Sequence, residues 1–197
     1  PLDFTFYDEF LHWNTANHIL STAHLFAPNP LLPVSSLYPG LEVITTALSN
    51  LSGFSVVTSG VIILGIARIG FMLGLYLFYE RISSSPQIGG IAALLYTANS
   101  NFLFFDSQFS YESLSLPIAV TVLFLVAYST NKATGKYLQH LLLVVPLVFV
   151  VAFTHHLTSY VLVGILMLWA IVALLKNYKS GEWIKVGIVG VLALGVL

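Results

Sequence analysis

The sequence contains no cysteine and few charged residues, and both shortages narrow the kinds of protein it can encode. Without cysteine there is no disulfide framework, no thiolate zinc site and no thiol nucleophile. Only 8% of the 197 residues are charged, whereas a soluble domain has about 25%. The seven basic residues form no patch of the kind that binds nucleic acid. A disordered tail, a nucleic-acid-binding protein and an ordinary cytosolic enzyme are therefore excluded.

What the sequence does contain is long apolar runs, which predict an all-α, polytopic transmembrane bundle. Hydrophobic residues make up 57% of the chain, and the mean hydropathy is +0.91. A helix needs about 20 mostly apolar residues to cross a bilayer. Five runs approach this length and a sixth begins near the end: 56–79, 88–105, 113–129, 137–154, 157–175 and 186–197. We expect the chain to be a piece of a longer protein, with a helix before Pro1.

The charged residues predict how these spans are oriented. If the spans alternate in direction, six of the seven basic residues fall on one side, which the positive-inside rule makes cytoplasmic: Arg81, Lys132, Lys136, Lys176, Lys179 and Lys185. The opposite side receives six of the eight acidic residues and five of the six histidines. We therefore expect a multi-pass membrane protein whose active side faces away from the cytoplasm.

Residues 1–55 are too polar to cross the membrane, and we expect them to form an outer loop preceding the bundle of residues 56–197. Four large apolar residues at helical spacing share one stripe: Phe6, Phe10, Trp13 and Leu20. They predict a helix that lies on the membrane surface. Four prolines make residues 27–40 extended, and helical spacing returns at 41–51, which predicts a second interfacial helix.

The first candidate site lies in this loop, where Asp8 and Glu9 precede His12 by about one helical turn. A carboxylate beside a histidine can act as a general base or as a metal ligand. We predict that Asp8 and Glu9 are catalytic, and that His12, with one of them, binds Mg²⁺ or Mn²⁺. The alternative is a solvated helix start, because acidic residues favour the first turn of a helix.

Two further groups lie between predicted spans on the same side. Asp106, Gln108 and Glu112 border the hydrocarbon region, where acidic side chains are costly unless they face a cavity, a metal or a partner. An exposed turn at the membrane interface would also explain them. His155 and His156 stand between two spans with no room for a loop, and they suit phosphate contact or metal ligation.

The remaining candidate is Arg68, which lies deep inside the first span. A charge at this depth indicates a functional site, with a carboxylate or a phosphate as its partner. An ion pair with a helix outside this sequence is the alternative.

The chain order of these motifs resembles that of the C-type (GT-C) glycosyltransferase superfamily, which includes protein mannosyltransferases and lipid A aminoarabinose transferases. Five short segments carry the resemblance: YDEFLHW at 7–13, YPGLE at 38–42, ARI at 67–69, DSQFSYE at 106–112 and THHLT at 154–158. They are similar to an Asp-Glu pair after the first span, a proline-containing motif, an early arginine, an acidic outer motif and a later outer turn.

The resemblance implies inverting transfer of a sugar from a polyprenyl-phosphate donor to a glycan, lipid or protein acceptor, at times with a divalent metal. Asp8 would deprotonate the acceptor, with Glu9 beside it. We expect these residues to bind the substrates: Glu42, Arg68, Asp106, Gln108, Glu112, His155 and His156. Tyr38 and Gln108 stand where the superfamily often has Lys or Arg. A metal, the histidines or Arg68 would therefore have to neutralise the lipid phosphate.

Two other functions are compatible with the sequence. A secondary transporter would use Arg68 and the outer acidic residues as a cation or proton path. A non-catalytic membrane subunit would share the fold without the chemistry. Convergence of Asp8 with Glu112 or His155 in one outward cavity would favour the transferase, and a midplane cavity at Arg68 would favour transport.

Overall fold

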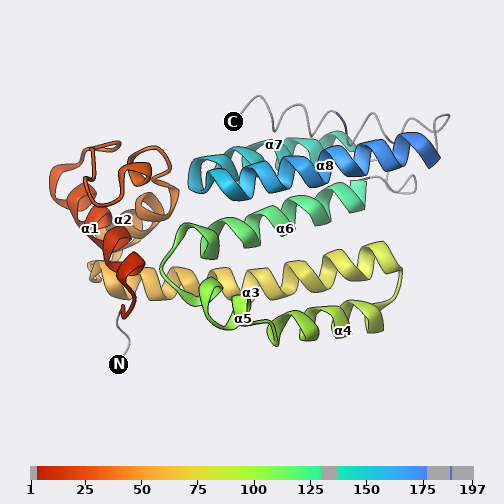
Figure 1. The fold of residues 1–197 in the computed structure, drawn as a ribbon, viewed down its shortest axis with the longest axis horizontal. Coiled ribbons are helices and arrows are strands. Elements are labelled where there is room, and N and C mark those ends of the chain that lie inside the picture. Colours follow the sequence, from red (N-terminus) through yellow and green to blue (C-terminus); the bar gives the residue numbers. More distant parts are fainter. Residues whose placement is uncertain (1–3, 130–136, 177–186, 188–197) are drawn as a thin grey trace.

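The computed structural model describes residues 4–129, 137–176 and 187, and this part of the chain is helical without any strand, as predicted (Figure 1). The elements are α1 Tyr7–Thr22, η1 Pro33–Ser36, α2 Gly40–Ser52, α3 Val56–Ser83, α4 Pro86–Thr97, α5 Ser100–Leu103, η2 Phe105–Ser107, α6 Tyr111–Ser129, α7 Tyr137–Thr154 and α8 His156–Lys176. Helices α1 and α2 are found where the sequence predicts two surface helices, and their position at a membrane surface stays a prediction. The proline-rich segment between them is irregular and holds only the short helix η1.

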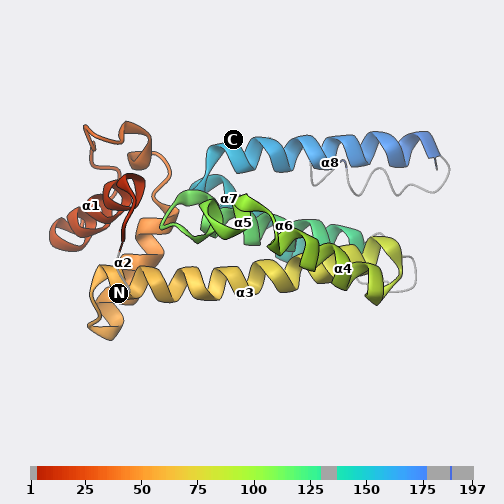
Figure 2. The same ribbon diagram turned by 60° about the horizontal axis from the view of Figure 1, so that its bottom comes forward.

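The long helices lie side by side, and α1 and α2 cover one end of them (Figure 1). Helix α3 packs between α4 and α6, and α6 also contacts α7 and α8. Figure 2 shows α3 and α8 on opposite sides, with α6 and α7 between them. Because α1 contacts α2 and both contact α3, residues 4–52 are attached to the bundle at the end where α3 begins.

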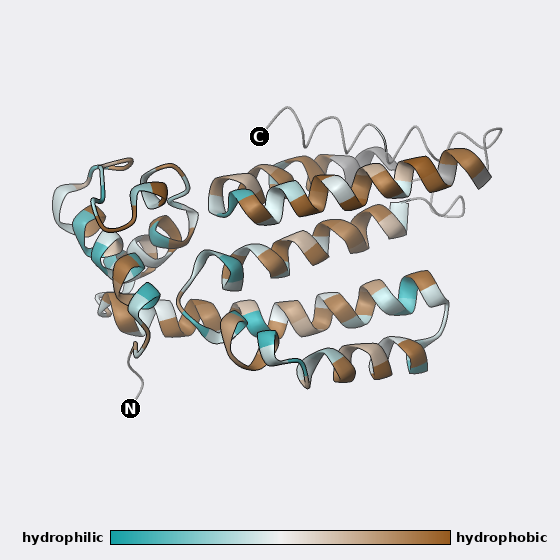
Figure 3. Cartoon of the chain, in the orientation of Figure 1, coloured by the Kyte–Doolittle hydropathy of each residue, from teal (hydrophilic) through white to brown (hydrophobic). Residues whose placement is uncertain are grey.

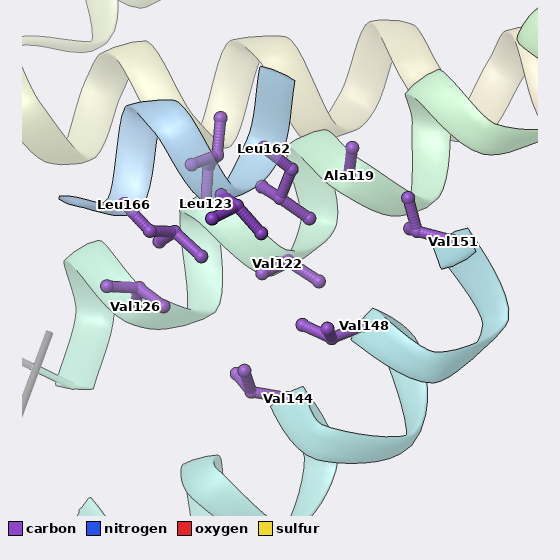
Figure 4. Packing of buried hydrophobic residues seen from close by; sticks show 10 residues of the cluster. Ala119, Val122, Leu123, Val126, Val144, Val148, Val151, Leu162 and Leu166 are labelled. Atoms are coloured by element: carbon purple, nitrogen blue, oxygen red, sulfur yellow. The ribbon is translucent and has the colours of Figure 1, made fainter. Parts of the chain in front are cut away.

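The largest apolar core joins α6, α7 and α8 (Figure 4). Its buried side chains are mostly valine and leucine: Ala119, Val122, Leu123, Val126, Val144, Val148, Val151, Leu162, Val163 and Leu166. In a bilayer, lipid tails are as apolar as these side chains, so such a core is held by close packing rather than by exclusion of water. This packing fixes the junction of α7 and α8, where the two predicted histidines lie.

Two glycines are required by the backbone itself. Gly53 ends α2 with a φ of 76°, a left-handed conformation that glycine adopts without strain. Gly89 lets α4 approach α3 closely, because a Cβ atom there would lie 2.9 Å from the backbone nitrogen of Glu80. The α3–α4 hairpin therefore depends on a small residue at position 89.

Two helices, α3 and α6, are long and apolar enough to cross a membrane. Apolar residues cover the long helices, and hydrophilic ones gather in α1, α2 and the segment leading into α6 (Figure 3). The predicted span 88–105 is not one continuous helix: α4 ends at Thr97, and residues 100–107 turn by 65°. If this bent pair counts as one span, three helices qualify in the described part. Helices α7 and α8 contribute the shorter apolar stretches Leu142–Thr154 and His156–Val172.

Some predictions fall on residues outside the described part of the chain. These are the start of a sixth span at 186–197, and four of the basic residues used to orient the spans: Lys132, Lys136, Lys179 and Lys185.

Candidate functional site

A cavity of about 430 Å³ lies where α4, the turn before α6, and the beginning of α8 meet. Three of the predicted site residues line it together: Asp106, Glu112 and His155. Its other walls are Tyr96, Asn101, Phe105, Leu116, Leu157, Thr158 and Val161. The bend after α4 makes this possible, because it folds residues 100–107 back toward the first turn of α6.

Asp106 is buried on the short helix η2, and its carboxylate accepts a hydrogen bond from the Tyr96 hydroxyl, with 3.3 Å between the oxygens. Tyr96 comes from the last turn of α4, on the other side of the bend. The tyrosine therefore fixes the orientation of one cavity carboxylate.

Glu112 differs from Asp106 in that its carboxylate has no hydrogen-bond partner among the described residues. It is half-buried in the first turn of α6 and faces the cavity. The start of a helix stabilises a negative charge through the backbone dipoles. Glu112 is thus an available carboxylate in a partly enclosed space, as a general base requires.

His155 is the third polar wall of the cavity, and it belongs to the tight connection between α7 and α8. Its Nδ1 lies 2.7 Å from the Thr158 hydroxyl, which in turn lies 2.9 Å from the Ser115 hydroxyl. Burial, together with His156 and His12, lowers the pKa of His155 from 6.5 to about 4. The imidazole is therefore neutral at pH 7, and it can donate or accept a hydrogen bond without carrying charge.

A buried polar group lies behind the cavity, between α1, α2 and α6. The Nδ1 atom of His12 lies 2.8 Å from Oε1 of Glu42, and Glu42 is fully buried. The His12 ring packs edge-on against Tyr111 at 4.1 Å, and Tyr111 stacks on His155 at 5.8 Å. Glu42 and His12 therefore support the cavity wall from behind and do not line the cavity.

Glu9 is committed to backbone hydrogen bonds. Its Oε2 accepts from the N–H groups of Thr5 and Phe6 at 2.8 and 2.9 Å, and its Oε1 accepts from the N–H of Phe109 at 2.9 Å. Asp8, one residue earlier, is exposed, has no side-chain hydrogen bond in the described residues and does not line the cavity. The convergence of Asp8 with Glu112 or His155 that would favour the transferase is therefore absent from this cavity, and the catalytic role of Asp8 stays a prediction.

The other predicted residues surround the cavity without lining it. Arg68 lies over the ring of Phe102 at 4.3 Å, and its Nη1 is buried without a hydrogen-bond partner in the described part. His156 stacks on Tyr38 at 4.8 Å. Gln108 is buried in the turn before α6, where its backbone oxygen accepts a hydrogen bond from Ser113.

Two of the residues predicted to bind a metal, His12 and Glu9, have other partners in the described part of the chain. Among the described residues, no three histidine, aspartate or glutamate side chains come together as metal ligands. The Nδ1 of His12 is occupied by Glu42, and the carboxylate of Glu9 is committed to three backbone N–H groups. The binding of Mg²⁺ or Mn²⁺ by His12 with Asp8 or Glu9 stays a prediction.

Sequence reasoning missed Tyr96, Asn101 and Ser115, which join the site through the bend after α4 and the packing of α6 against α8. Proximity of this kind has no local signal in the sequence. Thr158 could have been predicted from the sequence, because it belongs to the motif THHLT. No protein-family model, curated protein or solved structure matches the chain.

Proposed function

We propose that this protein is a multi-pass membrane glycosyltransferase that moves a sugar from a polyprenyl-phosphate donor to an acceptor on the side of the membrane away from the cytoplasm. The observation that carries the proposal is that Asp106, Glu112 and His155 line one cavity of about 430 Å³. These polar residues lie at the end of the apolar helices, next to α1 and α2, where the headgroup of a lipid donor would lie.

In this proposal Glu112 is the general base. Its carboxylate takes the proton of the acceptor hydroxyl while the oxygen attacks the anomeric carbon of the sugar. The bond between that carbon and the phosphate oxygen breaks, and polyprenyl phosphate leaves with the bonding electrons. Because Asp106 accepts a hydrogen bond from Tyr96, it is suited to holding the sugar rather than to moving the proton.

The leaving phosphate needs positive charge or hydrogen-bond donors. Arg68 is the nearest candidate cation in the described part, since its guanidinium lies over Phe102, next to Asn101 of the cavity wall. Neutral His155 is a second donor. The family resemblance implies Asp8 as the base instead, so Asp8 and Glu112 give opposite expectations in an activity assay.

The exposed face of α1 supports placement at a membrane surface. Phe6, Phe10, Trp13 and Leu20 are 37–47% exposed and share one stripe, while the opposite face of α1 packs against the protein. A stripe of large apolar side chains beside a membrane-spanning bundle is well suited to the lipid interface. The helix would then bring the outer loop and the cavity to the depth of the lipid headgroup.

The test is transfer of a labelled sugar from polyprenyl phosphate by the protein reconstituted in liposomes. Glu112→Gln keeps the size of the side chain and removes its basicity, so turnover should fall by about 10²–10⁴-fold. Asp8→Asn is the matched variant and should retain activity. Loss of transfer in Asp8→Asn with full activity in Glu112→Gln would move the base to Asp8. No transfer by the wild type with any polyprenyl-linked sugar would refute the proposed function.

The secondary transporter is the other candidate, and it predicts a different result. Its charged path would pass Arg68 in the middle of α3, yet Arg68 does not line the cavity that holds the acidic residues. Proton or cation uptake by proteoliposomes that depends on Arg68, without sugar transfer, would favour transport.

A further inference from the structure

Another polar cavity, of about 370 Å³, lies at the opposite end of the bundle, where α3 ends and α4 begins (Figure 1). It combines the adjacent charged residues Glu80 and Arg81 with the apolar side chains of Leu77 and Phe124. Its volume falls within the roughly 300–1,000 Å³ usual for small-molecule sites. The proposed transferase does not use this cavity.

Arg81 is held in place by two contacts with α6. Its Nε donates a hydrogen bond to the backbone oxygen of Ala127 at 3.3 Å, and its guanidinium lies 5.0 Å from the ring centre of Tyr128. The two terminal nitrogens of Arg81 form no hydrogen bond with any described residue. A fixed guanidinium with two available nitrogens is a preformed site for a phosphate.

Glu80 brings the opposite charge into the same cavity. Consecutive residues on a helix point about 100° apart, so the two side chains flank the cavity from different directions. They form no ion pair with each other, because the pair of His12 and Glu42 is the one found in the described part of the chain. A ligand that satisfies both must carry an anion and a cation a few bonds apart.

The position of the cavity along α3 indicates what that ligand is. Glu80 and Arg81 lie in the last turn of α3, where its apolar stretch ends, and hydrophilic colour marks this end of the helix (Figure 3). If α3 crosses the membrane, the two charges lie at headgroup depth, and Leu77 and Phe124 lie toward the acyl chains. This step rests on the proposed membrane location and not on the transferase activity.

We propose that this cavity binds phosphatidylethanolamine, with its phosphate on Arg81 and its primary ammonium on Glu80. Phosphatidylglycerol offers the phosphate but no cation for Glu80. Phosphatidylcholine carries a quaternary ammonium that has no N–H to donate to a carboxylate. The charge pair therefore selects the ethanolamine headgroup over both.

The experiment is native mass spectrometry of the delipidated full chain in detergent, with the three lipids added at equal concentration and with identical acyl chains. The wild type should retain phosphatidylethanolamine about tenfold more tightly than either competitor. Arg81→Gln should weaken binding of phosphatidylethanolamine and phosphatidylglycerol about tenfold or more, because both depend on the phosphate contact.

Glu80→Gln is the decisive variant, because it should abolish the preference for phosphatidylethanolamine over phosphatidylglycerol while leaving phosphatidylglycerol binding as it was. The readout is a ratio of two lipids in one sample, so it does not depend on the folded fraction of the variant. Equal retention of the three lipids by the wild type, or an unchanged preference in Glu80→Gln, overturns the proposal. Lipid selection without sugar transfer would refute the transferase alone.

Discussion

We expect Glu9→Ala to destabilise the protein strongly and Asp8→Ala to have little effect, although both changes remove a carboxylate from the first turn of α1. The two residues are adjacent, but the helix turns them to different sides. Glu9 points inward and joins the start of α1 to the turn before α6 through the N–H of Phe109, one hundred positions away. Asp8 points outward and has no such partner among the described residues.

The magnitude follows from what each carboxylate contacts. Phe109 is fully buried, so loss of Glu9 leaves its N–H without water or protein to bond, at a cost of about 1–3 kcal/mol. The N–H groups of Thr5 and Phe6 lose their acceptor at the helix start, which costs about 0.5–2 kcal/mol. Glu9→Ala should therefore lower the free energy of unfolding by roughly 1.5–5 kcal/mol. Asp8→Ala loses only a helix-dipole contact of about 0.3–1 kcal/mol.

The assay is chemical unfolding of the detergent-solubilised protein, followed by circular dichroism, with the two variants measured in parallel. Glu9→Gln is a useful third variant, because an amide keeps one acceptor oxygen and should fall between wild type and Glu9→Ala. Equal destabilisation by Asp8→Ala and Glu9→Ala would refute the inward position of Glu9 and the attachment of α1 to the turn.

Three further predictions test the fold and the site. Gly89→Ala should destabilise the protein by about 1–3 kcal/mol, because the added Cβ would press on the α3 backbone. The Cβ of Gly90→Ala faces open space, and this change should stabilise the protein by up to about 1 kcal/mol. The melting temperatures of the two variants test both expectations. Between pH 6.5 and 4, His155 is protonated in the unfolded chain but not in the folded chain, so the free energy of unfolding should fall on acidification. His155→Gln should therefore show a flatter profile of melting temperature against pH. Glu42→Ala should cost about 1–3 kcal/mol, because it leaves the buried Nδ1 of His12 without its partner, and a double-mutant cycle of the two residues should give a coupling energy well above zero.

Local patterns predicted the helices well. Helix α3 begins at Val56, as the apolar run indicates, because Ser55 accepts a hydrogen bond from the N–H of Thr58 and caps the helix. The prolines between α1 and α2 keep that segment out of regular helix, as expected. The apolar stripe of α1 was also predicted, and it is exposed. These features depend on interactions between residues a few positions apart, so they can be predicted from the sequence alone.

Contacts between distant segments could not be predicted in the same way. Residues 88–105 have no charge, so hydropathy alone joins them into one span, yet the Asn99 side chain accepts a hydrogen bond from the N–H of Asn101 and starts a new helix after the bend. This bend brings Asp106 to Tyr96. The pairing of His12 with Glu42, thirty positions apart, likewise depends on how α1 packs on α2.

The position of the unpaired polar atoms is the strongest physical reason to place function at the α1–α2 end. A buried nitrogen or oxygen without a hydrogen bond costs stability, and folded proteins hold few of them. In the described part of the chain, such atoms include Oε2 of Glu42, Nη1 of Arg68 and Nδ1 of His156. None of the three belongs to the valine-rich core that α6 shares with α7 and α8, and His156 packs against His155 of the cavity wall. A fold optimised for stability alone would pair these groups or replace them with apolar residues, whereas a site that binds a polar ligand keeps them available.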